Sequence, residues 1–143
     1  MKICIGCDPN ASAAKEELKA FIEKKGLGDV TDFGSDDTVY ANVAFRVAKS
    51  VAAGEFDRGI LLCGTGIGMS IAANKIKGAY AALISDVYSA QRARLSNDAN
   101  IACMGAFTTG SKVRELMTEA FLTCEFQPGC SSQPKVDAYK KIG

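Results

Sequence analysis

The chain has 143 residues, of which 48% are hydrophobic and 23% are charged, and its formal net charge is +1. This length and composition are typical of one globular domain with a substantial core, so we expect residues 1–143 to form a single domain. The near-neutral charge gives no indication of a nucleic-acid or membrane-surface partner. No window reaches the roughly 18 apolar residues of a membrane span and no signal peptide is visible, so we expect a cytoplasmic protein.

The chain contains no histidine, so any proton transfer must use Cys, Asp, Glu, Lys, Tyr or a hydroxyl group. A zinc site would need cysteines and carboxylates alone, and we expect no metal. Cys4 and Cys7 fall within one predicted strand, where their thiols are not expected to converge as a redox pair. The remaining cysteines, which mostly fall in apolar segments typical of buried thiols, are Cys63, Cys103, Cys124 and Cys130.

The first part of the chain predicts two strand–helix units. Ser12 or Asn10 is expected to cap the first helix, whose first turn would carry Glu16 and Glu17. The expected elements are a strand over 2–7, a turn over 8–12, a helix to 25, a strand over 30–33 and a helix over 40–53.

The most informative stretch follows. Residues 59–62 are continuously apolar, as in a buried parallel strand, and Cys63 ends them. Gly64, Gly66 and Gly68 then remove side chains from alternate positions of a turn, so a ligand can approach the backbone N–H groups. The start of the following helix would favour an anion or a developing oxyanion.

The second half continues the alternation. Asp86 ends a strand that we expect to be buried, and Thr108 or Thr109 is expected to cap the helix after the fifth strand. The expected elements are helices over 68–74, 87–95, 111–124 and 135–142, strands over 79–85 and 101–104, and a turn-rich tail over 126–134.

Strands that alternate with helices predict an α/β fold, a Rossmann-like α/β/α sandwich around a five-stranded parallel sheet. In such sheets ligands bind beyond the carboxyl ends of the strands, at a topological switch point. The residues expected at that edge are 7–10, 63–66, 85–86 and 105–107.

Each candidate site residue has an ordinary structural alternative. The glycine turn can be a tight connection without a ligand, and it does not match a dinucleotide fingerprint. Cys63 can be a core residue, but a thiol beside exposed N–H groups is favoured as a thiolate. Thr65 can donate its hydroxyl into the same space, whereas Asp8 and Asp86 can be site residues or helix caps.

The sequence resembles the type B ribose-5-phosphate isomerases and the related galactose-6-phosphate isomerase subunits over nearly its whole length. The matching segments are Ile5–Asp8, Asp32–Gly34, Tyr40, Gly59–Lys75, Tyr88–Gln91, Asn97–Asn100 and Gly105.

The resemblance implies a cofactor-free and metal-free aldose–ketose isomerisation through a cis-enediolate. It implies that Cys63 moves the proton between C1 and C2, and that the N–H groups of 64–68 and the Thr65 hydroxyl stabilise the enediolate oxygen. Met69 stands where members without this cysteine carry a glutamate. The resemblance also implies a homodimer or homotetramer with active sites shared between subunits, and a tail, about 126–143, that packs on the partner.

The chain departs from the family where the substrate would be held. Pro9, Ser96 and Phe107 replace a histidine, a ring-opening histidine and an arginine, and the region from Cys130 to Lys135 replaces the phosphate-binding arginines. The expected substrate-binding residues are Asp8, Pro9, Tyr40, Gly64, Gly66, Ile67, Gly68, Ser96, Asn97, Phe107 and Lys135.

Three hypotheses follow. The first is an isomerase for a small sugar phosphate similar to ribose 5-phosphate, with a tetrulose phosphate or a non-phosphorylated sugar as the alternative substrate. The second is a non-catalytic subunit of a hetero-oligomeric isomerase, because part of the family's site is missing. The third and weakest is a redox protein that uses Cys4 and Cys7.

Overall fold

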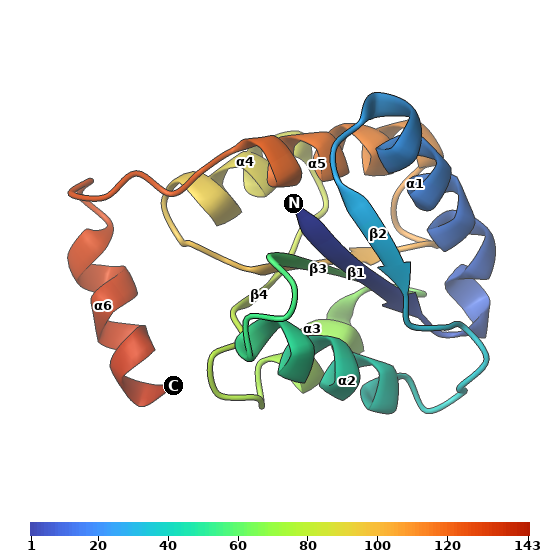
Figure 1. The fold of residues 1–143 in the computed structure, drawn as a ribbon, viewed down its shortest axis with the longest axis horizontal. Coiled ribbons are helices and arrows are strands. Elements are labelled where there is room, and N and C mark those ends of the chain that lie inside the picture. Colours follow the sequence, from blue (N-terminus) through green and yellow to red (C-terminus); the bar gives the residue numbers. More distant parts are fainter.

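The computed structural model describes residues 1–143 as a five-stranded parallel sheet covered by helices on both faces (Figure 1). The strands are β1 (Lys2–Cys7), β2 (Asp29–Asp32), β3 (Arg58–Cys63), β4 (Ala81–Leu83) and β5 (Ile101–Gly105). The helices are α1 (Ser12–Lys25), α2 (Tyr40–Ala52), α3 (Ile67–Ala73), α4 (Val87–Leu95), α5 (Ser111–Thr123) and α6 (Gln133–Ile142), with a 3₁₀ turn, η1, at Pro9–Ala11. The predicted Rossmann-like fold is confirmed.

The strand order β2-β1-β3-β5-β4 creates a switch point between β1 and β3, because the chain leaves β1 on one side and comes back on the other. Cys7 pairs with Leu62, and Cys63 pairs with Gly105 on the next strand. The loops after β1, β3 and β5 therefore meet at the carboxyl edge of the sheet.

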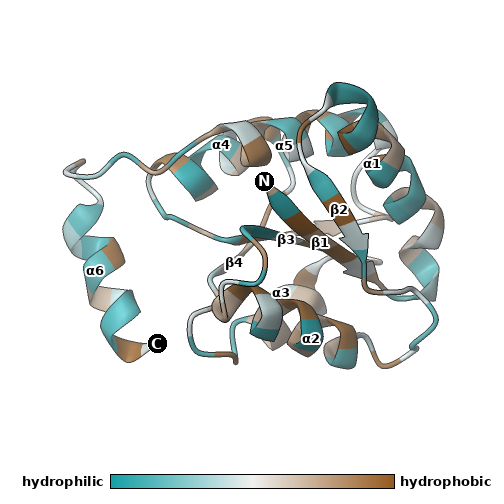
Figure 2. Ribbon diagram, viewed as in Figure 1, coloured by the Kyte–Doolittle hydropathy of each residue, from teal (hydrophilic) through white to brown (hydrophobic).

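Two apolar clusters enclose the sheet. Helices α1, α4 and α5 pack on one face, where Ile5, Ile60 and Leu62 are fully buried, whereas α2 and α3 cover the face that carries Leu61 and Cys103. Brown, hydrophobic segments dominate β1 in Figure 2. Because both faces are covered, the central strands β1 and β3 are apolar at successive positions instead of alternating, as the sequence pattern indicated.

Cys4 and Cys7 belong to opposite clusters, one on each face of the sheet, and both thiols are free. Their separation confirms that they do not converge. The redox hypothesis therefore has no support in the structure.

The predicted caps of two helices are wrong. Neither Ser12 nor Asn10 caps α1, because the η1 turn precedes it and Ala11 takes the cap position without a side-chain bond. Gly110 precedes α5 in the same way, and Thr109 instead donates its hydroxyl to the carbonyl oxygen of Gly105 at 2.6 Å. That hydroxyl is used to close the turn after β5.

The fourth strand is shorter and more exposed than the sequence indicated. It covers only Ala81–Leu83, and Leu83 is 43% exposed because β4 lies at the sheet edge and pairs with β5 alone. The Asn74 side chain donates to the carbonyl oxygen of Ala81 at 2.8 Å and accepts from its N–H at 2.9 Å. This amide occupies part of the edge that a sixth strand would otherwise use.

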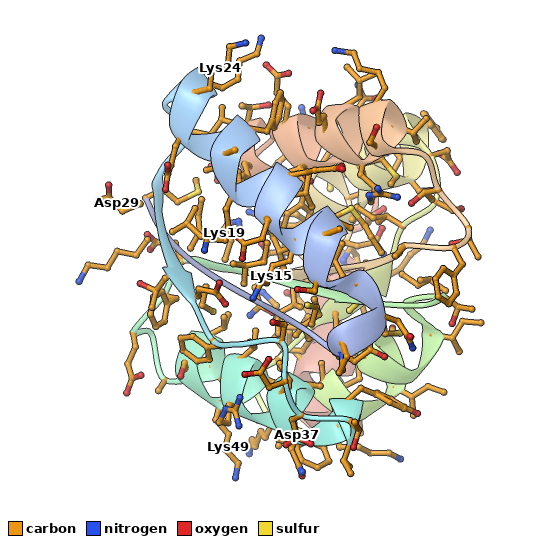
Figure 3. All side chains as sticks on the ribbon, turned by 90° about the vertical axis from the view of Figure 1, so that its right-hand side faces the viewer. Lys15, Lys19, Lys24, Asp29, Asp37 and Lys49 are labelled. Carbon is orange, nitrogen blue, oxygen red and sulfur yellow. The ribbon has the colours of Figure 1, made fainter.

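A buried lysine joins α1 to β2. The Nζ atoms of Lys15 and Lys19 each lie 2.9 Å from a carboxylate oxygen of Asp32, and Lys15 is 2% exposed. Figure 3 shows both lysines on the side of α1 that faces β2. Partial burial raises the pKa of Asp32, but the hydrogen bonds from Lys19 and Lys15 outweigh it and lower that pKa to about 2.

We expect Asp32→Asn to destabilise the fold by about 2 kcal/mol at pH 6, because it removes the carboxylate nearest to the buried Lys15 ammonium and leaves only Glu16, at 3.7 Å. A carboxyl whose folded pKa is lowered stabilises above its unfolded pKa, and that contribution is lost as pH falls. The difference from wild type should therefore shrink as pH falls from about 4 towards 2. Urea unfolding across this range measures it, with the exposed Asp29→Asn as the control; an undiminished difference at pH 2 would contradict the ion-pair assignment.

Candidate active site

The loop between β3 and α3 encloses a thiol. Cys63 ends β3 with 6% exposure, and its Sγ accepts a hydrogen bond from the backbone N–H of Gly66 at 3.1 Å. The loop therefore holds the sulfur in a fixed place beside a backbone hydrogen-bond donor.

Gly66 is required at this position for two reasons. Its φ angle is +79°, which L side chains rarely adopt, and a Cβ there would lie 2.9 Å from the carbonyl carbon of Met104 and 2.8 Å from Leu83. The loop thus lies directly on the end of β5. Any side chain at Gly66 would push the loop, and the N–H that contacts Cys63, away from the sheet.

Several loop N–H groups remain free. The N–H of Ile67 is occupied by the Thr65 hydroxyl oxygen at 3.2 Å, whereas those of Gly64, Thr65 and Gly68 have no partner within the chain. Thr65 and Ile67 are both exposed. Because α3 has only seven residues, these loop groups, more than a helix dipole, form the anion-binding feature beside Cys63.

Asp8 contributes an unpaired acceptor at the same edge. Its side chain is 7% exposed, and Oδ1 has no hydrogen-bond partner, while Oδ2 accepts from Asn10 at 3.4 Å. Its backbone N–H donates to the carbonyl oxygen of Leu62, which places it beside the end of β3. A buried oxygen of this kind needs a donor, and a substrate hydroxyl would supply one.

Two aromatic rings flank the glycine loop. Phe107 is 73% exposed and lies over Gly64, where an added Cβ would come within 3.0 Å of the ring. Its N–H also donates to the carbonyl oxygen of Gly64 at 2.9 Å. Tyr40, which opens α2, lies directly against Gly68, and the exposed Pro9 opens η1 beside Asp8.

Asp86 is a helix cap. Its Oδ1 accepts from the N–H of Ser89 at 2.6 Å, and its Oδ2 accepts from the Ser89 hydroxyl at 2.8 Å. These bonds and the N–H of Tyr88 lower the pKa of the Asp86 carboxyl. Both carboxylate oxygens therefore serve α4, in agreement with the structural alternative for this residue.

The remaining predicted substrate-binding residues lie away from the carboxyl edge of the sheet; they are Ser96, Asn97 and Lys135. Ser96 and Asn97 follow α4, which runs back from the carboxyl edge of the sheet. The next residues lead into β5, and just before that strand the carbonyl oxygen of Asn100 accepts a hydrogen bond from the N–H of Gly59. Lys135 is exposed on α6, which stands apart from the sheet in Figure 1. One copy of the chain therefore does not bring these three residues to Cys63.

A groove of about 420 Å³ lies between the β4 edge and α6, and its walls include Tyr80, Leu83, Arg92, Asn97 and Tyr139. None of its lining residues belongs to the Cys63 loop. No three Cys, Asp or Glu side chains converge as a metal site would require. None of the helices is both long enough and apolar enough to cross a membrane.

A family model described as Ribose/Galactose Isomerase matches residues 3–139. The chain belongs to this family. It is 46% identical to a Listeria innocua protein named ribose-5-P isomerase B, over 99% of this chain and 97% of that protein. It is 44% identical to a Pectobacterium atrosepticum protein named D-erythrulose-4-phosphate isomerase, over 100% and 93%.

A solved structure of Clostridium thermocellum ribose-5-phosphate isomerase B superposes with a TM-score of 0.92 at 39% identity, covering 99% of this chain and 97% of that one. The isomerase family indicated by the sequence resemblance is thereby confirmed. The chain is an aldose–ketose isomerase by its relatives.

Proposed function

We propose that this isomerase interconverts the aldose and ketose forms of a small sugar phosphate similar to ribose 5-phosphate and ribulose 5-phosphate. The main support for this proposal is the position of the Cys63 sulfur. It accepts a hydrogen bond from a backbone N–H and lies in the loop that carries the free N–H groups of Gly64, Thr65 and Gly68. A base beside unpaired donors fits a reaction that removes a proton from carbon while negative charge develops on oxygen.

In the proposed reaction the Cys63 thiolate removes the proton from C2 of the open-chain aldose. The C2–H electron pair forms the C1–C2 double bond, and charge moves to the carbonyl oxygen of a cis-enediolate. Free loop N–H groups and the Thr65 hydroxyl donate to that oxygen, a contribution of about 3–4 kcal/mol. The proton on O2 then passes to O1 so that the carbonyl forms at C2, and the Cys63 thiol returns the carbon-bound proton to C1. Asp8 Oδ1 accepts a hydrogen bond from a substrate hydroxyl.

The proposed site requires two copies of the chain. Residues 1–143 act as one isomerase domain, and Ser96, Asn97 and Lys135 reach the Cys63 loop of the partner, with the tail of about 126–143 packed on that partner. Support comes from their distance from Cys63 along the sheet and from exposed apolar side chains near the β4 edge, which are Ile67, Ile71, Leu83 and Tyr88. We propose a homodimer or homotetramer in the cytoplasm, where charged sugar phosphates are retained.

A different substrate is the second candidate. The chain has no histidine to open a sugar ring, and the exposed Phe107 stands over Gly64. A tetrulose phosphate or a non-phosphorylated sugar would suit these features. A non-catalytic subunit of a hetero-oligomer is a third candidate, favoured only by the missing histidine and arginines.

Exchange of substrate C–H protons in deuterated water tests the proposal. We expect the purified chain, with no added metal or second protein, to introduce deuterium into ribulose 5-phosphate or a tetrulose 4-phosphate. Exchange by this chain alone would exclude the non-catalytic subunit. No exchange with any phosphorylated or unphosphorylated aldose or ketose of four to six carbons would overturn the isomerase proposal.

A further inference from the structure

An ion cluster joins α6 to the loop after α4. The carboxylate of Asp98 accepts from Arg94 Nη1 at 3.0 Å with one oxygen and from Lys140 Nζ at 2.5 Å with the other. Asp98 is also the one non-glycine residue with a positive φ, +52°. An aspartate in this left-handed conformation, with both oxygens used, fixes the direction of the loop as well as its contacts.

Arg94 connects the same loop to the start of the tail. Its side chain is nearly fully buried, and it donates to the carbonyl oxygens of Ala99 at 2.7 Å and Cys124 at 3.3 Å. It also lies 3.5 Å from a carboxylate oxygen of Glu125. One guanidinium therefore contacts both the loop after α4 and the segment after α5 that leads to α6.

The residues beside this cluster are those assigned to the partner's site. The Tyr139 hydroxyl donates to the carbonyl oxygen of Asn97, the residue next to Asp98. Lys135 lies four residues before Tyr139 and so shares its side of α6. Moving α6 relative to the loop would therefore change the position of Lys135 relative to Asn97.

We propose that Asp98 is a positioning residue that holds Asn97 and α6 in the orientation in which they complete the second copy's Cys63 site. The inference rests on the shared site of the proposed function. Asp98 does not touch substrate; it acts through its bonds to Arg94 and Lys140. An ordinary stabilising ion pair would instead affect only the folding of its own chain.

Asp98→Asn separates these roles, because asparagine tolerates the left-handed backbone while the charge is removed. We expect kcat/KM to fall about 10- to 100-fold, mainly through a higher KM, since the substrate-holding groups are displaced while Cys63 is untouched. Lys140→Met, which breaks the same pair from α6, should give the same split. Asp137→Asn, on α6 but bonded only to Gln133, should leave both constants unchanged.

Mixing of subunits provides the decisive readout. Cys63→Ala and Asp98→Asn proteins are unfolded together, refolded and assayed against each parent. Mixed dimers contain one site with both defects and one with neither, so random pairing should restore about a quarter of the wild-type activity. Lys140→Met mixed with Cys63→Ala should behave alike.

Asn97→Ala mixed with Cys63→Ala is the control for a shared site. If this control regains activity and the Asp98→Asn mixture does not, Asp98 acts within its own chain and the inference is overturned. If neither mixture regains activity while wild type is active, the shared site itself fails, and the inference with it. An inactive wild type would instead overturn the proposed function.

Discussion

Cys63→Ala is expected to lower kcat about 1,000-fold with little change in KM, because a positioned base contributes about that factor and the chain holds no histidine to replace it. The Gly66 N–H that now points at sulfur would face an empty space. Cys63→Ser should be similarly inactive, since a hydroxyl is a far weaker acid than a thiol and so provides almost no anion to act as the base. Steady-state kinetics and C2 proton exchange measure the loss.

Cys103→Ala is the matched control. Cys103 is also a free, fully buried cysteine on the same face of the neighbouring strand, and burial raises the pKa of its thiol so that it stays neutral. Its replacement should cost about 1 kcal/mol of stability through a small cavity and leave kcat within a few-fold of wild type. If Cys63→Ala kept a tenth of the exchange rate, Cys63 would not be the base.

The fold followed from the sequence because β1, β3 and β5 are buried on both faces and so read as nearly continuous apolar runs bounded by turns. The stretch from Gly59 to Gly68 predicted a strand, a thiol and an open loop in their observed order. The prediction for β4 was too long and too buried, because its apolar residues resemble those of a buried strand. They lie at the sheet edge, where exposure depends on what lies beside the sheet.

The contacts that give the site its chemistry depend on tertiary structure. No spacing rule indicates that Oδ1 of Asp8 has no partner, or that the Ile67 N–H is already occupied while those around it are free. The separation of Asn97 from Cys63 follows only from the direction in which α4 runs. The contacts of Asp98 could not be predicted from the sequence either, because they depend on its positive φ angle and on a hydrogen bond from Lys140, 42 residues away.

The chain has no histidine that could open a cyclic sugar substrate, so we expect it to act best on sugars that are already open. Ribose 5-phosphate closes a five-membered ring through its 4-hydroxyl, whereas ribulose 5-phosphate and a tetrulose 4-phosphate cannot form such a ring and stay open. With no histidine in the chain to open a sugar ring, we expect kcat/KM for a tetrulose 4-phosphate to exceed that for ribose 5-phosphate about 100-fold.

The three substrates separate ring opening from chain length. If ring opening is the missing step, both open-chain ketoses should exchange protons readily, and turnover of ribose 5-phosphate should stop rising with added enzyme because spontaneous opening limits it. Ser96→His should then raise the ribose 5-phosphate rate without changing the tetrulose rate. Equally slow exchange of ribulose 5-phosphate would contradict this account, because that sugar needs no opening; discrimination would then arise from the length of the pocket, with Phe107 as its wall.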